Sequence, residues 1–214
     1  MELDSQIKEL DTLILQMAGQ VEKNLFYALD VYLNYSSIKQ YPPVDDYIVN
    51  NYERLIEEKA LNIMLKERLY AKDMRMVTGI MTMVEDLERL GDHAQDVLEF
   101  SLKLRNNSSV RSAQIKNLTD FVIKMVKDSI QSYISRDIDL AKKVTGEDDH
   151  VDEEYARLID FLIKENERDE VSSSFAIYTT LVVKYIERIA DHATNIAEWV
   201  IYIVSGYYKD RQIV

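Results

Sequence analysis

The sequence predicts an all-α protein made of two tandem antiparallel three-helix bundles with six long helices. Three observations support this prediction. Gly and Pro are scarce, at 5 and 2 of 214 residues, so few positions interrupt a regular backbone. Apolar residues recur every three or four positions along most of the chain, which is the spacing of one helical face. A segment of eight residues occurs twice, which indicates that the two halves of the chain are alike.

The repeated segment is LERLGDHA at residues 87–94 and IERIADHA at residues 186–193. Glu, Arg, Asp, His and Ala occupy the same positions in both copies, at a constant offset of 99 residues (187 − 88 = 99 and 192 − 93 = 99). Two modules of about a hundred residues each are therefore expected, a usual size for a small domain. We place them at residues 1–106 and 107–214, with the boundary in the polar segment NNSS at residues 106–109.

Three helices are predicted in the first module. The first begins after Asp4 or Ser5, continues to about residue 35, and presents an apolar face formed by Leu10, Ile14, Met17, Val21, Leu25 and Ala28. The segment 41–43, which contains two prolines, separates it from a second helix at about 44–69, with an apolar face formed by Ile48, Tyr52, Leu55, Ile56, Ala60 and Met64. The third helix covers about 71–104. It contains Gly79 and Gly91, and because Gly inside a helix costs about 1 kcal/mol relative to Ala, we expect close helix packing at both.

The second module repeats this scheme. One helix is expected over about 112–143, a second over about 148–165 and a third over about 172–207. Short connections between them predict antiparallel neighbours.

Composition excludes several classes of function. The chain has 26 Lys and Arg against 38 Asp and Glu, a net charge of −12, which disfavours nucleic acid as a partner and favours cations. It has no Cys, which rules out disulfides, thiolate zinc sites, iron–sulfur clusters and thiol catalysis. No glycine-rich phosphate loop or nucleophile constellation is present, so no enzyme is predicted. No apolar run approaches twenty residues and the first residues lack a secretory signal pattern, so we expect a cytoplasmic protein without membrane insertion.

The repeated segment places acidic residues in pairs. Glu88 and Asp92 lie one helical turn apart on one face, as do Glu187 and Asp191, and Glu85 and Asp96 extend the first pair to a line of four acids. Like charges at this spacing destabilise a helix by a few tenths of a kcal/mol. A compensating partner is therefore expected: the adjacent Arg89 or Arg188, an arginine of another helix, or a bound cation. The alternative is a solvated acidic face with intrahelical salt bridges.

Further acids begin other helices. Asp148 and Asp152 have the same spacing at the start of the fifth helix, and the matching positions of the second helix hold Asp46 and Asn50. Asp46 and Asp148 are also explained by the helix dipole alone. At the start of the third helix, the simplest interpretation of Asp73 and Arg75 is capping or an interhelical ion pair.

The histidines do not fit a ligand role. His93 and His192 follow the aspartates by one position, about a hundred degrees around the helix, and so point elsewhere. The Glu-x-x-His spacing of di-iron bundles would need His at positions that hold Gly91 and Ala190. We expect these histidines to pack or to donate hydrogen bonds.

Both copies of the repeated segment, together with residues 17–22, 71–75, 151–155 and 199–206, resemble the PhoU family of regulators of phosphate uptake and phosphate signalling. The resemblance implies two three-helix bundles and a non-enzymatic negative regulator. Such a regulator links a Pst-type phosphate ABC transporter, through its PstB-like ATPase subunit, to a PhoR-like sensor kinase. It also implies a homodimer.

The resemblance further implies surface metal ions, iron or zinc in multinuclear clusters, held by (Glu/Asp)-x-x-x-Asp pairs. The positions that match are Asp46, Asn50, Glu88, Asp92, Asp148, Asp152, Glu187 and Asp191. Asn50 departs from the pattern, which predicts a weaker site in the first module or one that relies on Asp45. The alternative function is a carboxylate-bridged metal-binding bundle of ferritin-like enzymatic type.

Overall fold

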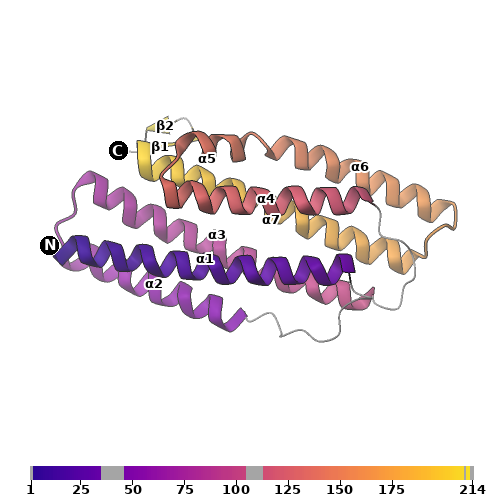
Figure 1. Ribbon diagram of the computed structural model, residues 1–214, viewed down its shortest axis with the longest axis horizontal. Helices are drawn as coiled ribbons and strands as arrows, with labels where there is room; N and C mark the ends of the chain where they lie inside the picture. The colour runs from indigo at the N-terminus through magenta and orange to yellow at the C-terminus, as the bar shows by residue number, and fades with distance from the viewer. Residues whose placement is uncertain (1, 35–45, 105–112, 210, 213–214) are drawn as a thin grey trace.

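The structure is a computed structural model, and it describes all residues except 1, 35–45, 105–112, 210 and 213–214. It is an elongated assembly of helices (Figure 1). The elements in chain order are α1 (Glu2–Asn34), α2 (Asp46–Lys66), α3 (Ala71–Lys103), α4 (Ala113–Ser135), α5 (Ile138–Thr145), α6 (Asp148–Glu167), α7 (Ser173–Ser205), β1 (Tyr207–Tyr208) and β2 (Arg211–Gln212).

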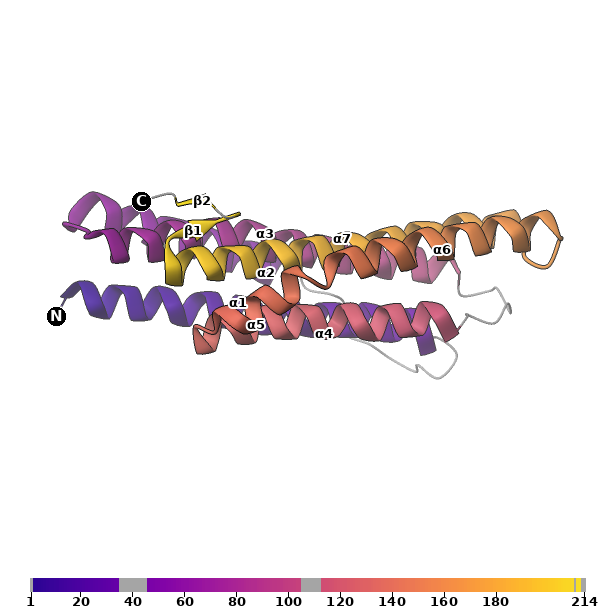
Figure 2. The same ribbon diagram turned by 90° about the horizontal axis from the view of Figure 1, so that it is seen from above.

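The helices form two bundles, which confirms the predicted fold class. Helices α1, α2 and α3 contact one another in the first bundle, and α7 contacts α4, α5 and α6 in the second. Contacts of α3 with α7 and of α1 with α4 join the bundles. Seen from above, α1 and α4 lie in one layer and α3 and α7 in another (Figure 2). The predicted module boundary at residue 106 and the proline segment 41–43 both lie outside the described residues.

The core follows the predicted apolar faces in most helices. The six apolar residues predicted for the first helix are all buried, none more than 4% exposed. The face predicted for the second helix is partly wrong, because Leu55 is 49% exposed whereas Val49 and Ile63 are buried. Helix α2 packs mainly against α1 and α3, so a narrow stripe of its apolar residues suffices to fill the contact.

Gly79 and Gly91 lie at close contacts between helices, as predicted. A Cβ atom at Gly79 would be 2.3 Å from Cγ1 of Ile203 on α7. At Gly91 it would be 3.2 Å from Cγ1 of Val49 on α2. Helix α3 therefore approaches α7 closely at Gly79 and α2 closely at Gly91. This close packing offsets the low helix propensity of glycine.

The fourth helix is shorter than predicted, and the described residues contain seven helices instead of six. Arg136 has a φ of 55°, in the left-handed region, which ends α4. The carboxylate of Asp137 then accepts hydrogen bonds from the backbone N–H groups of Asp139 and Leu140, at 2.9 and 3.0 Å, and caps α5. The Arg136 guanidinium is held by Asp11 of α1 at 2.9 Å and lies over the Tyr133 ring. The ion pair between Arg136 and Asp11 thus stabilises the break between α4 and α5.

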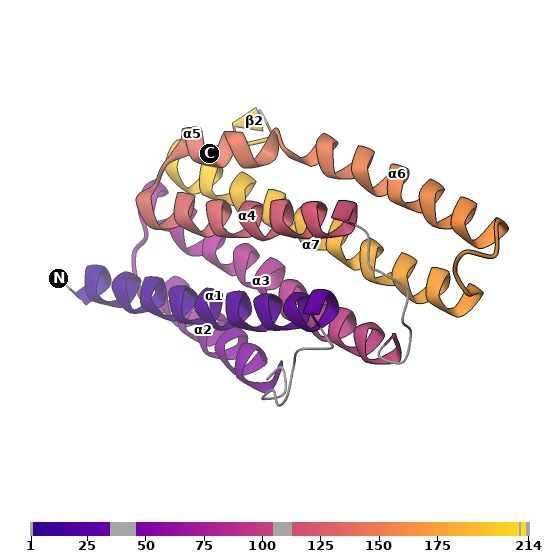
Figure 3. The same cartoon turned by 45° about the vertical axis from the view of Figure 1, so that its right-hand side comes forward.

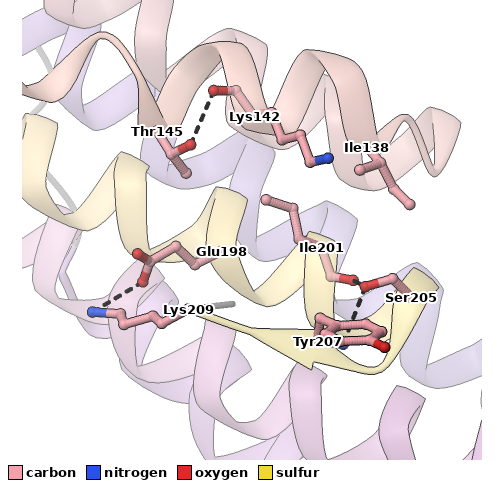
Figure 4. A pocket seen from close by; sticks show the side chains of 8 residues that line it. All are labelled: Ile138, Lys142, Thr145, Glu198, Ile201, Ser205, Tyr207 and Lys209. Carbon is pink, nitrogen blue, oxygen red and sulfur yellow. Dashed lines mark hydrogen bonds and ion pairs between the residues drawn. The ribbon is translucent and has the colours of Figure 1, made fainter. Parts of the chain in front are cut away.

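The chain after α7 forms a small hairpin that sequence periodicity did not predict. Gly206 ends α7 with a φ of 83°, and Tyr207 then pairs with Gln212. The Tyr208 ring stacks on Trp199 at 4.2 Å. Lys209 forms an ion pair with Glu198 at 3.1 Å beside a pocket of about 450 Å³ between α5 and α7 (Figure 4). None of the helices in the described part of the chain has the length and apolarity that crossing a membrane requires.

Candidate metal centres

The two copies of the repeated segment meet at the contact between the bundles. Helices α3 and α7 run side by side in opposite directions (Figure 3), and the rings of His93 and His192 lie with centroids 5.3 Å apart. Nδ1 of His192 is 2.9 Å from Oδ1 of Asp86, and the same oxygen accepts a hydrogen bond from Asn195 at 3.2 Å. Asp86 is 8% exposed, so this polar network is enclosed within the interface.

His93 occupies the other half of this contact. Its ring lies 5.3 Å from the Tyr185 ring, and its Nδ1 is 3.6 Å from Oδ2 of Asp96. Burial, followed by the repulsion of His192, lowers the pKa of His93 to about 4, so the ring is neutral at physiological pH. The prediction that the histidines pack or form hydrogen bonds is confirmed: His93 packs against Tyr185 and His192, and His192 contacts Asp86. Asp96 lies beside Asp92 as predicted, because repulsion by Asp92 adds to the burial that raises the pKa of Asp96, and it also approaches His93.

The second acidic cluster consists of Asp148 and Asp152 of α6 with Glu187 and Asp191 of α7. Asp152, Glu187 and Asp191 each offer an oxygen atom, and these atoms all lie within 4.8 Å of one another. Asp148 accepts a hydrogen bond from the Thr194 hydroxyl at 3.1 Å, which fixes it at the edge of the group. The structure thus brings together four residues that come from two helices and were identified from spacing alone.

The carboxylates of the second acidic cluster repel one another. Burial raises the pKa of Asp191 to about 6, and Glu187, Asp148 and Asp152 add to the rise by repulsion. Burial likewise raises the pKa of Asp148, with further contributions from neighbouring acids, while the Thr194 hydroxyl lowers it. Carboxylates held close together against their charge are a feature of cation sites, because a bound cation removes the repulsion.

The compensating partner in this cluster is a lysine. Lys184 donates to both carboxylate oxygens of Glu187, at 2.6 and 2.7 Å, and also lies 5.1 Å from the centre of the Tyr155 ring. The candidate partner Arg188 instead lies over the Tyr185 ring, at 5.8 Å. The signal for Lys184 was its place three residues before Glu187 on the same helix, where long side chains meet.

The first acidic cluster consists of Asp46, Asn50 and Glu53 of α2 with Glu88 and Asp92 of α3. Asn50 donates to Oδ2 of Asp46 at 3.1 Å, while Oδ1 of Asp46 is shielded from solvent and has no hydrogen-bond donor among the described residues. Burial, then repulsion from Asp46, raises the pKa of Asp92. Burial, then Asp92 and more weakly Glu53 and Asp46, raises that of Glu88. The four predicted positions therefore share one electrostatic environment.

Sequence reasoning missed Glu53 and identified Arg89. Arg89 pairs with Asp92 at 3.3 Å and with Glu88 at 3.6 Å, which confirms it as a compensating partner. Burial raises the pKa of Glu53, and Asp92 and Glu85 contribute to the rise. Glu53 was detectable, because it lies seven residues after Asp46 and three after Asn50, on one helical face. It supplies a carboxylate where Asn50 lacks one. Asp45, the other candidate, lies outside the described residues.

The two clusters differ in the charge of matching positions. Glu53 and Glu85 of the first correspond to Tyr155 and Lys184 of the second, where the ammonium group of Lys184 lies over the Tyr155 ring. Within the described residues, only the second cluster brings three ligand atoms within 4.8 Å. Both clusters offer oxygen ligands alone, and such sets suit hard cations. The residues of the second cluster therefore fit a bound cation.

Comparison with known proteins identifies the family. The model of the PhoU domain matches the chain twice, at residues 14–101 and 115–200. A phosphate-specific transport system accessory protein PhoU homolog from Clostridium acetobutylicum is 29% identical over 212 residues, which cover 97% of this chain and 96% of the relative. A homolog of the same name from Pseudomonas aeruginosa is 32% identical over 209 residues, covering 96% of this chain and 86% of that protein.

Solved structures agree with this result. The crystal structure of PhoU from Pseudomonas aeruginosa matches with a TM-score of 0.88 and 29% identity, covering 95% of this chain and 99% of that one. The regulatory protein PhoU from Streptococcus pneumoniae, at 22% identity, shares the fold with a TM-score of 0.83 and coverage of 98% and 100%. Two domain matches over most of the chain, relatives of matching length and a common fold show that the chain belongs to the PhoU family.

Proposed function

We propose that this protein is an accessory and negative regulator of phosphate transport, which restrains phosphate uptake and phosphate-starvation signalling when phosphate is plentiful. The observation that carries the proposal is the match to PhoU domains in both bundles, with relatives named as accessory proteins of the phosphate-specific transport system. In this proposal the protein acts in the cytoplasm as an adaptor, and its effect on phosphate uptake tests this role. It docks by its helices onto the ATPase subunit of the transporter and onto a sensor kinase.

The adaptor is proposed to act without catalysing a reaction. The two histidines of the repeated segment face each other across the bundle interface, where His192 contacts Asp86, and neither belongs to an acidic cluster. The Glu-x-x-His arrangement of ferritin-like enzymes therefore lacks a counterpart at these positions. A metal-dependent oxidase or phosphatase activity of the purified protein that disappears in Asp92→Ala would favour the enzymatic alternative.

We also propose that the acidic clusters hold metal ions, iron or zinc, and that two chains form a homodimer. The raised pKa of Asp191 and the three converging oxygen atoms support a cation in the second cluster. Because every ligand is an oxygen, iron is the better match of the two metals. Metal analysis of the purified protein tests this proposal, with Asp191→Ala as the variant expected to lose metal, and light scattering tests the homodimer.

Deletion of the gene tests the regulatory role. In high phosphate, the deletion strain should take up more phosphate and express phosphate-starvation genes, and the wild-type gene should restore repression. A capture experiment from cells grown in high phosphate should recover the transporter ATPase and the kinase. Unchanged uptake together with unchanged gene expression would rule the proposal out.

A further inference from the structure

Helices α1 and α3 begin at the same end of the molecule (Figure 1). A cavity of about 550 Å³ is lined by residues from this end. Its walls come from the first turns of these two helices, from the break between α4 and α5, and from the end of α7. Its volume is within the range of sites that bind small molecules. It lies apart from both acidic clusters, with which it shares no residue.

The cavity is basic in a chain that is acidic as a whole. Four of its lining residues are cationic, namely Lys8, Lys72, Arg75 and Arg136, whereas Asp4 and Asp73 are its two acids (4 − 2 = +2). The net charge of the whole chain is −12. A concave site lined by one sign of charge concentrates the opposite charge, so this cavity favours anions where the rest of the surface repels them.

Two arginines of the cavity have unused hydrogen-bonding capacity. Nε of Arg75 and Nη1 of Arg136 are each shielded from solvent and have no acceptor among the described residues. Nη2 of Arg136 donates to Asp11 of α1 at 2.9 and 3.1 Å. The side chain of Arg75 makes no hydrogen bond or ion pair within the described residues, so an interhelical ion pair, one of the two roles expected from sequence, is absent there. A shielded guanidinium N–H without an acceptor is unfavourable, and a bound anion would satisfy it.

The start of α3 adds backbone donors next to the cavity. Tyr70 precedes this helix, and its side chain forms no capping hydrogen bond to the backbone N–H groups of the first turn, to which the lining residue Lys72 belongs. The N-terminal end of a helix carries partial positive charge and favours phosphate and other anions. Apolar residues also line the cavity, Ile7, Met76 and Ile203 among them.

We propose that this cavity binds a small phosphate ester, with the phosphate group on Arg75 and Arg136 and the organic part against the apolar lining residues. Guanidinium groups match phosphate oxygens in geometry and charge, which is why phosphate is favoured over a single carboxylate. The volume is larger than one inorganic anion requires, and part of the lining is apolar, so an ester is favoured over free phosphate. The inference is independent of the proposed regulatory role and of the metal ions.

Isothermal titration calorimetry on the full chain tests the proposal with three probes: adenosine monophosphate, inorganic phosphate and adenosine. Adenosine monophosphate should bind most tightly, inorganic phosphate more weakly, and adenosine not measurably. In Arg75→Gln, the affinity for adenosine monophosphate should fall at least about tenfold, the usual effect of losing a charged hydrogen-bond donor. Rising salt should weaken binding.

The matched control is Arg157→Gln, which removes an exposed arginine of α6 that pairs with Glu153 at 3.2 Å and lies outside the cavity. It should bind adenosine monophosphate like the wild type. The thermal stability of Arg75→Gln should equal that of the wild type, because Arg75 has no partner to lose among the described residues. The proposal is overturned if neither phosphate probe binds at millimolar concentration, if Arg75→Gln binds as tightly as the wild type, or if adenosine binds as well as its monophosphate.

Discussion

Replacing Asp191 by Asn should stabilise the metal-free protein. Asn keeps the shape of the side chain but removes one charge from the second acidic cluster, where Glu187, Asp148 and Asp152 repel it. Its pKa is raised from 3.8 to about 6, and at 1.36 kcal/mol per pKa unit the whole rise corresponds to about 3 kcal/mol. Because Asp191 is partly open to water, which screens the repulsion, we expect a gain of about 1 kcal/mol.

The gain should depend on pH in a defined direction. The folded-state pKa of Asp191 is above the unfolded value, so its ionised form destabilises the folded state. This penalty is complete above about pH 6, fades as pH falls toward 3.8, and is absent below that value. The advantage of Asp191→Asn should therefore be full at about pH 7.5 and clearly smaller at about pH 4.5.

Urea denaturation of chelator-treated protein measures this effect. Added metal should reverse it, because the wild type gains binding free energy that the variant lacks. Asp160→Asn, an exposed acid of α6 outside the cluster, serves as the control and should change stability by less than about 0.5 kcal/mol. The reasoning fails if Asp191→Asn destabilises the metal-free protein at neutral pH, or if the gain is the same at both pH values.

Four further substitutions test the packing, the interface and the cluster. Gly79→Ala should lower the free energy of unfolding by about 1–3 kcal/mol, because its Cβ would lie 2.3 Å from a side chain of α7. By contrast, Gly19→Ala, with nothing within 4 Å, should raise it by up to about 1 kcal/mol. Asp86→Ala should lower it by about 2–3 kcal/mol, since it removes the hydrogen-bond partner of His192 at the interface. Lys184→Gln should tighten metal binding roughly two- to fivefold by removing a competing ammonium group.

Urea denaturation measures the first three variants, and calorimetry with a divalent cation measures the fourth. If Gly79→Ala and Gly19→Ala change the free energy of unfolding equally, close helix contact does not explain the glycine at position 79. A stable Asp86→Ala would mean that the interface network contributes little. Weaker metal binding in Lys184→Gln would show that this lysine organises the cluster instead of competing for it.

Much of the site was predictable because helical spacing is local. Glu187 and Asp191 are four positions apart and so lie one turn apart in any helix. Glu88 and Asp92, 99 residues earlier in the repeated segment, have the same spacing. Glu53 escaped notice although it has the same kind of spacing from Asp46. Only the packing of α2 on α3 reveals that it joins the first acidic cluster, because spacing states which residues share a face but not what that face meets.

The break between α4 and α5 shows a different limit. Residues 135–138 contain no Gly or Pro, and the helical pattern continues across them. Asp137 was the one local signal, as a residue type that caps helices. The left-handed Arg136 persists because Asp11, 125 positions earlier in the chain, holds its guanidinium. Sequence periodicity contains no information about such a partner.

The sequence by itself determined the helical class, the two modules, the paired carboxylates and the position of the histidines off the face of those carboxylates. All of these follow from residue type and from positions within a few turns of one helix. Only the tertiary structure decided that His93 meets His192 between the bundles, that Lys184 neutralises Glu187, and that Arg75 reaches a basic cavity without a partner. The reason is that these contacts depend on the rotation and separation of helices, which are fixed by the packing of the whole core.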